Sequence, residues 1–336
     1  MSEAMTANVQ LKYNGVDATV NLSNSMQSFS ITENATGSAD SINLELSNRN
    51  GKWSKGYYPV YGDWIKAWIK VENWKVGKKN EKLYLGKYTI DNIAFSNNPR
   101  TVSLSGISIP VKSGFNATQR NKTWKKTNVK TILSDIAKNA GVKFVYDAPN
   151  HKIDEESQSG QTDMSFAFSL CSEYGMCMKL FDNKLVVYEQ TKYEKADPAF
   201  VVSRNDVESY SFDVSTLTDY DCVRIQYTKG EKSDKTINYN FKRPGKKGER
   251  RLFVSTKCES VGQAETKAKA ALREELRKNK TVSFTMMGDI RFQAALNMKL
   301  EGFGRLNGKY FIDSVTHNIG NSFKTEVRAH AVVTDF

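Results

Sequence analysis

Apolar and polar residues alternate along most of the first hundred positions. Ala7–Tyr13 and Val16–Leu22 flank Asn14-Gly15, the dipeptide most typical of a tight β-hairpin. Regular alternation also places one apolar face on Ser41–Ser47 and Asp63–Val71. The alternation is less regular in Leu83–Leu85, Tyr88–Phe95 and Thr101–Ile107. Many short strands separated by polar turns predict an antiparallel barrel or sandwich.

Between about residues 112 and 195 the apolar period becomes helical. Thr127 is placed to cap a helix with one apolar stripe (Val129, Ile132, Leu133, Ile136, Ala137, Ala140), which Gly141 ends. A strand over Val142–Tyr146, a polar loop and a second helix from Asp163 to a stop at Gly175 follow. A hairpin then pairs Met176–Phe181 with Lys184–Tyr188. These elements predict a small α/β module.

From about residue 200 the β pattern returns. The expected strands are Val207–Val214, Tyr220–Thr228, Thr281–Met286, Met298–Leu300, Tyr310–Asn318 and Phe323–Val333. One long helix interrupts them, with a Ser260–Gln263 capping box and a narrow stripe of small residues and leucines (Ala264, Ala268, Ala271, Leu272, Leu276). Small residues favour close packing, either on the second β region or back on the middle module.

A short repeat links the two β regions. The pattern G-K-Y-x-I-D occurs at Gly86–Asp91 and again at Gly308–Asp313, near the end of each region. We therefore expect a duplicated β-barrel, in which Gly86 corresponds to Gly308 and Asp91 to Asp313. The predicted domains are 1–111, 112–199 and 200–336, with the option that 229–280 packs back on the middle module. The fold class is mainly β with an α/β insertion.

The chain of 336 residues carries a net charge of +12 but no apolar run long enough for a membrane span. Its start lacks the features of a signal peptide, so we expect synthesis in the bacterial cytoplasm and no membrane insertion. The densest basic clusters, 75–82 and 242–251, are expected to be solvated loops, or alternatively loops that dock on an acidic partner.

No catalytic constellation emerges from the sequence. Asp91 and Asp313 are the tempting acid/base pair, but their strand positions favour surface or turn-bonding roles. His317 and His330 lack a nearby nucleophile motif, and Cys171 lies at a core position near the end of its helix. The four cysteines (Cys171, Cys177, Cys222, Cys258) are expected to be buried free thiols. We predict no enzyme, no cofactor and no metal site.

Two long stretches resemble the phage late control gene D family, the tail hub proteins. They are "TILSDIAKNAGVKFVYD … QTDMSFAFSLCSEYGMCMKLFDNKLVVYE" and "AETKAKAALREELRKNKTVSFTMMGDIRFQAALNMKLEGFGRLNGKYFIDSVTHNIGNSFKTEVRAH". The resemblance covers roughly residues 110–336 and rests on the order of the elements rather than on one motif.

The resemblance implies a structural role. Hubs of this family are homotrimers with two similar tail-tube-like β-barrels in each subunit, so three chains present a near-six-fold ring. Such a baseplate hub joins the hexameric tube of a contractile tail, in a virion or a phage-derived tailocin, to a trimeric central spike. The implied partners are the tail tube protein and the spike, together with baseplate wedge and tape measure proteins.

Trp64 and Trp68 alternate with lysines on the outward face of one predicted strand. Exposed indoles are unusual on a free monomer. We expect them to contact an adjacent barrel or the spike; the alternative is burial beneath the middle module.

Two other functions stay open at this stage. A cell-wall-degrading tail enzyme would need a spatially clustered catalytic group. A nucleic-acid-binding protein would use the positive charge, but it would also need the clustered basic and aromatic surface that is missing here. We therefore expect no sequence-specific nucleic-acid binding.

Overall fold

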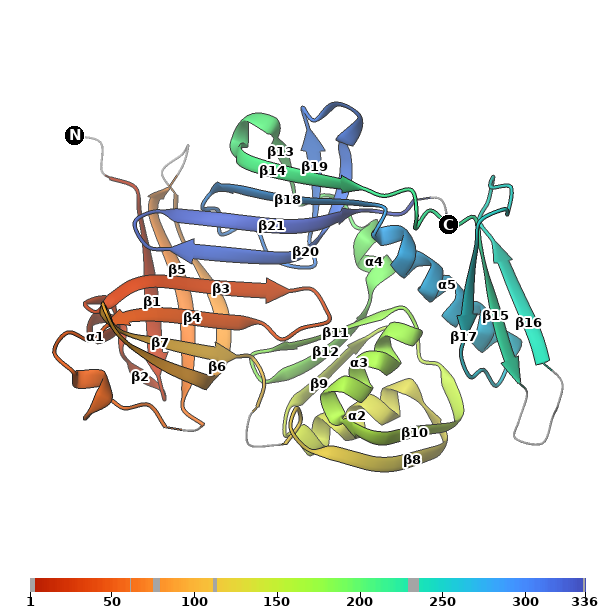
Figure 1. The fold of residues 1–336 in the computed structure, drawn as a ribbon, viewed down its shortest axis with the longest axis horizontal. Coiled ribbons are helices and arrows are strands. Elements are labelled where there is room, and N and C mark those ends of the chain that lie inside the picture. Colours follow the sequence, from red (N-terminus) through yellow and green to blue (C-terminus); the bar gives the residue numbers. More distant parts are fainter. Residues whose placement is uncertain (1–3, 61, 75–78, 111–113, 229–235, 335) are drawn as a thin grey trace.

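The fold is taken from a computed structural model, which describes residues 4–60, 62–74, 79–110, 114–228, 236–334 and 336. A β-rich region, a smaller α/β module and a second β-rich region with a helix-and-sheet appendage follow one another along the chain (Figure 1). The described chain is therefore mainly β, as the alternation pattern predicted.

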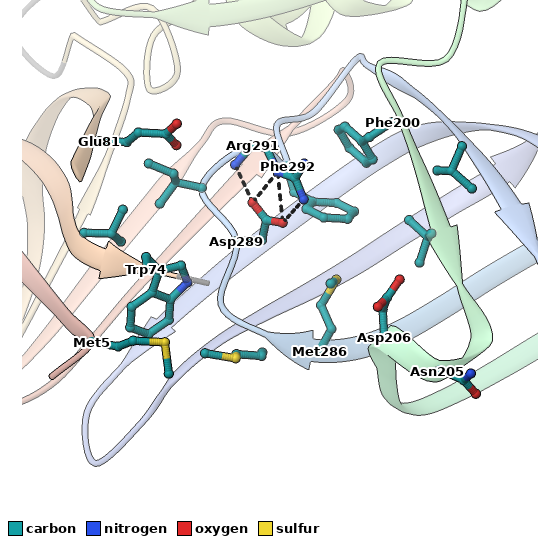
Figure 2. A pocket seen from close by; sticks show the side chains of 15 residues that line it. Met5, Trp74, Glu81, Phe200, Asn205, Asp206, Met286, Asp289, Arg291 and Phe292 are labelled. Carbon is teal, nitrogen blue, oxygen red and sulfur yellow. Dashed lines mark hydrogen bonds and ion pairs between the residues drawn. The ribbon is translucent and has the colours of Figure 1, made fainter. Parts of the chain in front are cut away.

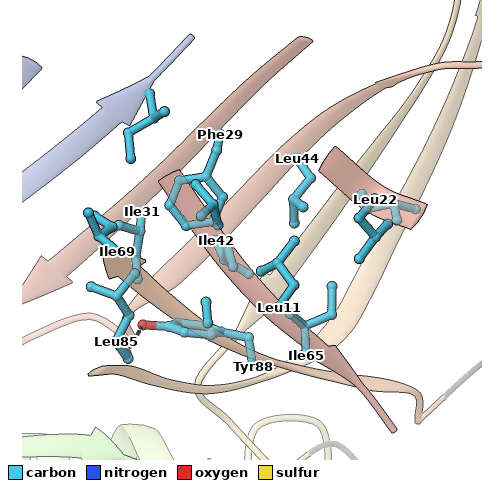
Figure 3. Packing of buried hydrophobic residues seen from close by; sticks show 14 of the residues in the cluster. Leu11, Leu22, Phe29, Ile31, Ile42, Leu44, Ile65, Ile69, Leu85 and Tyr88 are labelled. Carbon is cyan, nitrogen blue, oxygen red and sulfur yellow. Dashed lines mark hydrogen bonds between the residues drawn. The ribbon is translucent and has the colours of Figure 1, made fainter. Parts of the chain in front are cut away.

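The first β region is one antiparallel sheet in the order β3-β4-β7-β6-β5-β1-β2. Its elements are β1 (Thr6–Tyr13), β2 (Val16–Asp17), α1 (Thr19–Ser23), β3 (Met26–Asn34), β4 (Ser41–Ser47), the 3-10 turn η1 (Lys52–Ser54), β5 (Trp64–Trp74), β6 (Lys79–Asn97) and β7 (Arg100–Ile107). The sheet curls around a single core, to which strands from both of its ends contribute (Figure 3). The curl buries alternate apolar residues of every strand except β2 together, which stabilises the fold by ~1.5–3 kcal/mol for each large side chain.

Several details of this region differ from the sequence prediction, which contained no strand over Met26–Asn34, the observed β3. The expected strand over Val16–Leu22 is wrong beyond Asp17, whose side chain accepts the amide of Thr19 at 2.9 Å and starts the short helix α1. Leu22 is thereby buried against the core instead of standing in a strand. The two strands expected on either side of Gly86 are one strand, β6. The ladder with β5 continues past a bulge at Leu85, next to which Gly86 has a positive φ of 107°.

The middle module packs two helices between a three-stranded sheet and a two-stranded ribbon. Its elements are β8 (Gln119–Asn128), α2 (Val129–Ala140), β9 (Lys143–Asp147), β10 (Lys152–Thr162), α3 (Asp163–Glu173), β11 (Met176–Phe181), β12 (Lys184–Glu189) and α4 (Gln190–Lys195). The helix cap is Asn128 rather than the expected Thr127: Asn128 accepts the amide of Thr131 at 2.9 Å, while Thr127 belongs to the β8–β10 ladder. The expected polar loop before Asp163 contains β10.

The second β region has the strand order β13-β19-β20-β21-β18-β14. Its elements are β13 (Phe200–Ser203), η3 (Arg204–Asp206), β14 (Val207–Val214), β18 (Lys280–Met287), β19 (Asn297–Glu301), η4 (Gly304–Leu306), β20 (Gly308–Ile319) and β21 (Phe323–Ala331). All neighbouring strands pair antiparallel except β13 and β19, which are parallel. These strands surround a second apolar core.

An appendage is inserted between β14 and β18. It consists of a sheet in the order β16-β15-β17, from β15 (Cys222–Thr228), β16 (Thr236–Lys242) and β17 (Arg251–Ser255), and of α5 (Val261–Arg277). One face of α5 packs on this sheet, and its other side reaches the middle module, where a Cβ on Gly175 would lie 3.2 Å from that of Ala270. The predicted stripe (Ala264, Ala268, Leu272, Leu276) thus packs on the sheet of the appendage, while Ala270 on another side of α5 lies next to the middle module.

The two β regions share one continuous sheet. The first half of β20 pairs with β19, and its second half pairs antiparallel with β3 of the first region. In Figure 1, β3 and β20 accordingly run side by side where the two regions meet. This junction fixes the orientation of one β region relative to the other.

Candidate assembly surfaces and buried charge clusters

The two β regions repeat the same ladder, strand for strand. The order β3-β4-β7-β6-β5 in the first region corresponds to β14-β18-β21-β20-β19 in the second. The G-K-Y repeat lies at the same register in both copies: Gly86 and Tyr88 face Ala67 and Ile65, while Gly308 and Tyr310 face Leu300 and Met298. The expected match between Gly86 and Gly308 is therefore found in the ladders, and both glycines have positive φ values.

Irregularities of the ladder recur as well. In the β6–β7 pair the register skips Asp91, and in the β20–β21 pair it skips Asp313. In the β3–β4 pair it skips Gln27, and in the β14–β18 pair it skips Glu208. A β-bulge re-aims a strand and increases its twist, so two bulges at matched positions indicate one backbone design used twice.

The ladders diverge at their far ends. β1 runs antiparallel to β5, whereas β13 runs parallel to β19. The appendage is also inserted only in the second region. The duplication therefore concerns the five-stranded ladder and not the whole of each predicted domain.

The two candidate interface residues, Trp64 and Trp68, are half-buried on the outward face of β5. Lys87 Nζ lies 4.4 Å from the centroid of the Trp64 ring, and Lys82 Nζ lies 5.0 Å from that of Trp68. Contacts of this kind are worth ~0.5–1 kcal/mol at exposed sites. They keep the indoles ordered on a surface that retains partial access to solvent.

Tyr84 connects this surface to the middle module. Its ring lies 5.1 Å from that of Trp68 and 6.2 Å from that of Phe181, and its hydroxyl donates to Asp182 Oδ1 at 2.6 Å. Tyr84, which faces Trp68 across the β5–β6 ladder, thus contacts the β11–β12 hairpin. Trp64 instead borders a hollow of about 550 Å³ next to the Asn14–Gly15 turn.

A larger cavity of about 780 Å³ opens where the end of β5 meets the second β region (Figure 2). Its lining is mostly apolar and includes three methionines and two phenylalanines: Met5, Met286, Met287, Phe200 and Phe292. Trp74 Nε1 donates to the carbonyl of Gly288 at 2.7 Å, and Arg291 holds Asp289 with bonds of 2.6–3.1 Å. The polar groups on this wall are engaged with each other, which suits a packed joint better than a reaction site.

His330 is the centre of a buried charge cluster between the second β region, α4 and α5. Its Nδ1 lies 2.7 Å from Asp313 Oδ1 and its Nε2 lies 3.2 Å from Glu194 Oε1. Arg277 Nε donates to the same Glu194 oxygen at 2.7 Å. Burial alone would lower the pKa of His330, but the two carboxylates outweigh it and raise that pKa. The cluster ties elements together that are up to 136 residues apart.

His317 is completely buried and has a different environment. Its Nδ1 lies 3.0 Å from Thr325 Oγ1 and its Nε2 lies 3.1 Å from the carbonyl oxygen of Phe292. Burial lowers its pKa to about 4, so the ring is neutral at physiological pH. Both histidines are therefore buried and hydrogen-bonded.

The remaining candidates for chemistry do not gather into one site. Asp91 is exposed on the first β region, while Asp313 belongs to the His330 cluster of the second. Cys171 is buried, which raises its pKa well above the ordinary value, and all four cysteines are buried free thiols. Within the described ranges, no three His, Cys, Asp or Glu side chains lie close enough to hold a metal ion.

The basic loop at 242–251 is held by acidic side chains of its own chain. Arg243 Nη1 donates to Asp219 Oδ1 at 2.7 Å, and the amides of Gly248 and Glu249 donate to Asp221 at 3.1 and 3.0 Å. The loop expectation is confirmed for 243–250. Residues 75–78 of the other cluster lie outside the described residues, and its residues 79–82 belong to β6, so the loop expectation is wrong there. Every helix in the described part is too short or too polar to cross a lipid bilayer.

Comparison with curated proteins relates the chain to phage tails. It is 26% identical over 270 residues to the probable baseplate hub protein of Escherichia phage 186, an alignment that covers 77% of this chain and 66% of the relative. The chain is similar to phage baseplate hub proteins. The counterpart from Escherichia phage P2 is 24% identical over 230 residues, which cover 66% of this chain and 57% of that hub. The expected resemblance to phage tail hub proteins is confirmed, although the matches span about two thirds or less of the hubs' own length. No protein-family profile matches the chain.

Solved tail proteins share the fold over nearly the whole chain. A 43 kDa tail protein of prophage MuSo2 from Shewanella oneidensis has a TM-score of 0.72 at 11% identity, covering 97% of this chain and 98% of that protein. A tail protein from Neisseria meningitidis has a TM-score of 0.69 at 17% identity, covering 96% of both chains. An E. coli component of the type VI secretion system, described as similar to T4 tail proteins gp27 and gp5, has a TM-score of 0.61 at 13% identity, covering 97% of this chain and 78% of that one. At these identities the likeness establishes the shared fold and nothing further.

Proposed function

We propose that this chain is a structural tail hub that assembles as a homotrimer. The main support for this proposal is the repeated five-stranded ladder, with its two pairs of matched bulges. Two equivalent β regions in each chain let three chains present six similar units. The sequence likeness to proteins named probable baseplate hub proteins supports the same role.

A trimeric ring with six similar β regions would fit both a six-fold and a three-fold partner. Its six β regions would meet a hexameric tail tube, while its three middle modules would meet a trimeric central spike. Baseplate wedge and tape measure proteins are further proposed partners. The chain would be made in the bacterial cytoplasm and built into the baseplate of a virion or of a phage-like particle.

We propose a structural rather than an enzymatic role. The buried His330 and Glu194 are bound to each other, and Glu194 also accepts from Arg277. The hollow that His330 borders is small, at about 270 Å³. Trp64 and Trp68 are proposed to lie against the spike or an adjacent β region, since they are ordered by lysines but retain partial exposure.

The test is the mass and shape of the purified chain. Light scattering should give three times the chain mass of 37.9 kDa, and negative-stain images should show a three-lobed ring with a near-six-fold outline. A monomer at micromolar concentration would contradict the hub proposal. Clearing of peptidoglycan by the same sample would revive the alternative of a cell-wall-degrading enzyme.

A further inference from the structure

The junction between the two β regions shows how one ladder joins the next. The outer edge of β3 pairs antiparallel with the second half of β20, from Ser314 opposite Asn34 to Ile319 opposite Phe29. On one face of this junction the hydroxyls of Thr32 and Thr316 lie 2.9 Å apart. On the other face Phe29 and Ile319 join the apolar core.

The same two edges exist a second time in each chain. The ladder correspondence makes β14 the equivalent of β3, and the second half of β6, residues 92–97, the equivalent of the second half of β20. In the described part of the chain, neither of these segments has a ladder partner on its outer side. One junction is therefore complete, while its counterpart is present as two separate halves.

Exposed apolar side chains mark the two open edges. Tyr210 on β14 is 45% exposed, whereas the equivalent Phe29 is 1% exposed inside the junction. Phe95 on β6 is 44% exposed, whereas the equivalent His317 is fully buried. Tyr58, itself exposed, stacks on Phe95 with ring centroids 6.0 Å apart and extends the apolar surface at this edge.

Neither edge carries the lysines or prolines that commonly protect a free strand, although β14 carries Glu208 and Asp213 and both strands contain a bulge. Natural proteins blunt open edges with lysines, prolines or covering segments, because an unprotected edge pairs with other chains. This chain has 49 lysines and arginines, yet none lies in residues 92–97 or in Val207–Val214, and neither segment contains a proline. Two open edges of complementary kind, without lysine or proline, are the expected features of a permanent contact between copies.

We propose that β14 of one copy pairs antiparallel with residues 92–97 of the next copy, in the register that β3 and β20 use within the chain. This inference rests on the proposed trimer and specifies its contact surface. The ladder correspondence gives the residue pairs Asn92–Ser215, Ile93–Val214, Ala94–Asp213, Phe95–Phe212, Ser96–Ser211 and Asn97–Tyr210. Because the contact joins two different surfaces, it propagates head to tail and forms a ring when the rotation closes.

Cysteine cross-linking tests the register. Ala94 and Asp213 are the equivalents of Thr316 and Thr32, whose side chains touch within the chain. The double variant Ala94→Cys/Asp213→Cys should therefore form disulfides between copies under mild oxidation with copper phenanthroline. Non-reducing electrophoresis should show covalent dimers and closed trimers that disappear on reduction. The native cysteines are all buried, which keeps the background low.

Two matched variants control this experiment. Thr32→Cys/Thr316→Cys should close within one chain, and Ala94→Cys/Ser211→Cys, shifted by two residues, should cross-link far less. A trimeric Ala94→Cys/Asp213→Cys protein without cross-links, or equal cross-linking by the shifted pair, would overturn the register and leave the trimer standing. A protein that stays monomeric by light scattering and does not cross-link would overturn both.

Discussion

Asp91 and Asp313 occupy the same place in two ladders, because each is the residue that a bulge leaves without a partner on the next strand. Their side chains nevertheless differ in environment: Asp91 is exposed, while Asp313 accepts a bond from the buried His330 at 2.7 Å. The two copies therefore share the backbone bulge but differ in the residues that surround the aspartate. The repeat is thus a feature of the architecture and not two halves of an active site.

Adding a side chain at either of the repeated glycines, Gly86 and Gly308, should lower the stability of the fold. Gly86 has a φ of 107°, and a Cβ there would lie 3.1 Å from the Phe181 ring of the middle module. We expect Gly86→Ala to lower the free energy of unfolding by about 1–3 kcal/mol, because backbone strain adds to this close contact. Urea unfolding followed by tryptophan fluorescence measures the effect.

Two further glycine variants separate strain from crowding. Gly308 has a φ of 144° with open space around it, so Gly308→Ala should show the strain alone. Gly262 lies in the first turn of α5, in open space and without a positive φ, so Gly262→Ala should be neutral or slightly stabilising. Equal stability of the Gly86 and Gly262 variants would refute the role assigned to Gly86.

His317 should make the fold sensitive to acid. Its folded-state pKa of about 4 is below the ordinary value of 6.5, so the unfolded chain binds the proton first as pH falls. The contribution of neutral His317 to the free energy of unfolding is therefore fully present above about pH 6.5. It decreases as the pH falls from 6.5 to 4, by at most roughly 3 kcal/mol. We expect His317→Gln to be less stable at pH 7 but to show a flatter decline down to pH 4.5.

His330→Gln is the matched control for that pH series. The pKa of His330 is raised in the folded state, so its contribution is fully present below about pH 6.5 and is lost only as pH rises through the folded-state value. This variant should be less stable than the parent at pH 5 while keeping the parent's slope between pH 6.5 and 4.5. If His317→Gln keeps that slope as well, the acid sensitivity has another source.

Lys179 should contribute to folding stability mainly because it neutralises the buried carboxylate of Asp40. Lys179 Nζ on β11 lies 3.1 Å from Asp40 Oδ2, and that carboxylate is fully buried beside the first β region. Lys179→Met leaves the buried charge without its partner, so we expect a loss of about 3–5 kcal/mol. The double variant Lys179→Met/Asp40→Asn should recover part of this loss. Thermal unfolding of the two single variants and the double variant measures the coupling, and strictly additive losses would argue against it.

Trp68 should affect assembly more than folding. Its ring is half-buried beneath Lys82 and beside Tyr84, so Trp68→Ser removes apolar surface that is available to a partner. We expect a weaker trimer or weaker spike binding with a folded monomer, measured by light scattering and circular dichroism. Val20→Ser, at an exposed position on α1, is the control. A Trp68→Ser trimer that is folded, of unchanged mass and of unchanged affinity for the spike would remove Trp68 from the proposed interface.

Alternation of apolar and polar residues was sufficient to locate strands with one buried face. Ser41–Ser47 has its predicted bounds because burial on one side imposes a period of two. Val207–Val214 also has its predicted bounds, but its alternate residues Tyr210 and Val214 are exposed in this chain. The sequence pattern does not predict the β8–β10 ribbon, because most of its residues are polar and only a few, such as Trp124 and Ile153, are buried. Trp64 and Trp68 could be singled out locally, whereas the cluster of His330, Asp313, Glu194 and Arg277 could not, since its members lie on separate elements.

The sequence by itself determined where strand periodicity changes to helical periodicity and back, the G-K-Y-x-I-D repeat and the absence of any recognisable catalytic motif. Only the tertiary structure decided which edges meet: that β20 divides its length between β19 and β3, that α5 bridges two sheets, and that two equivalent edges stay open. The physical reason lies in the backbone. A side-chain pattern specifies which face of a strand is buried, but the hydrogen bonds along its edges are the same for every sequence, so partners are selected only when the whole chain packs.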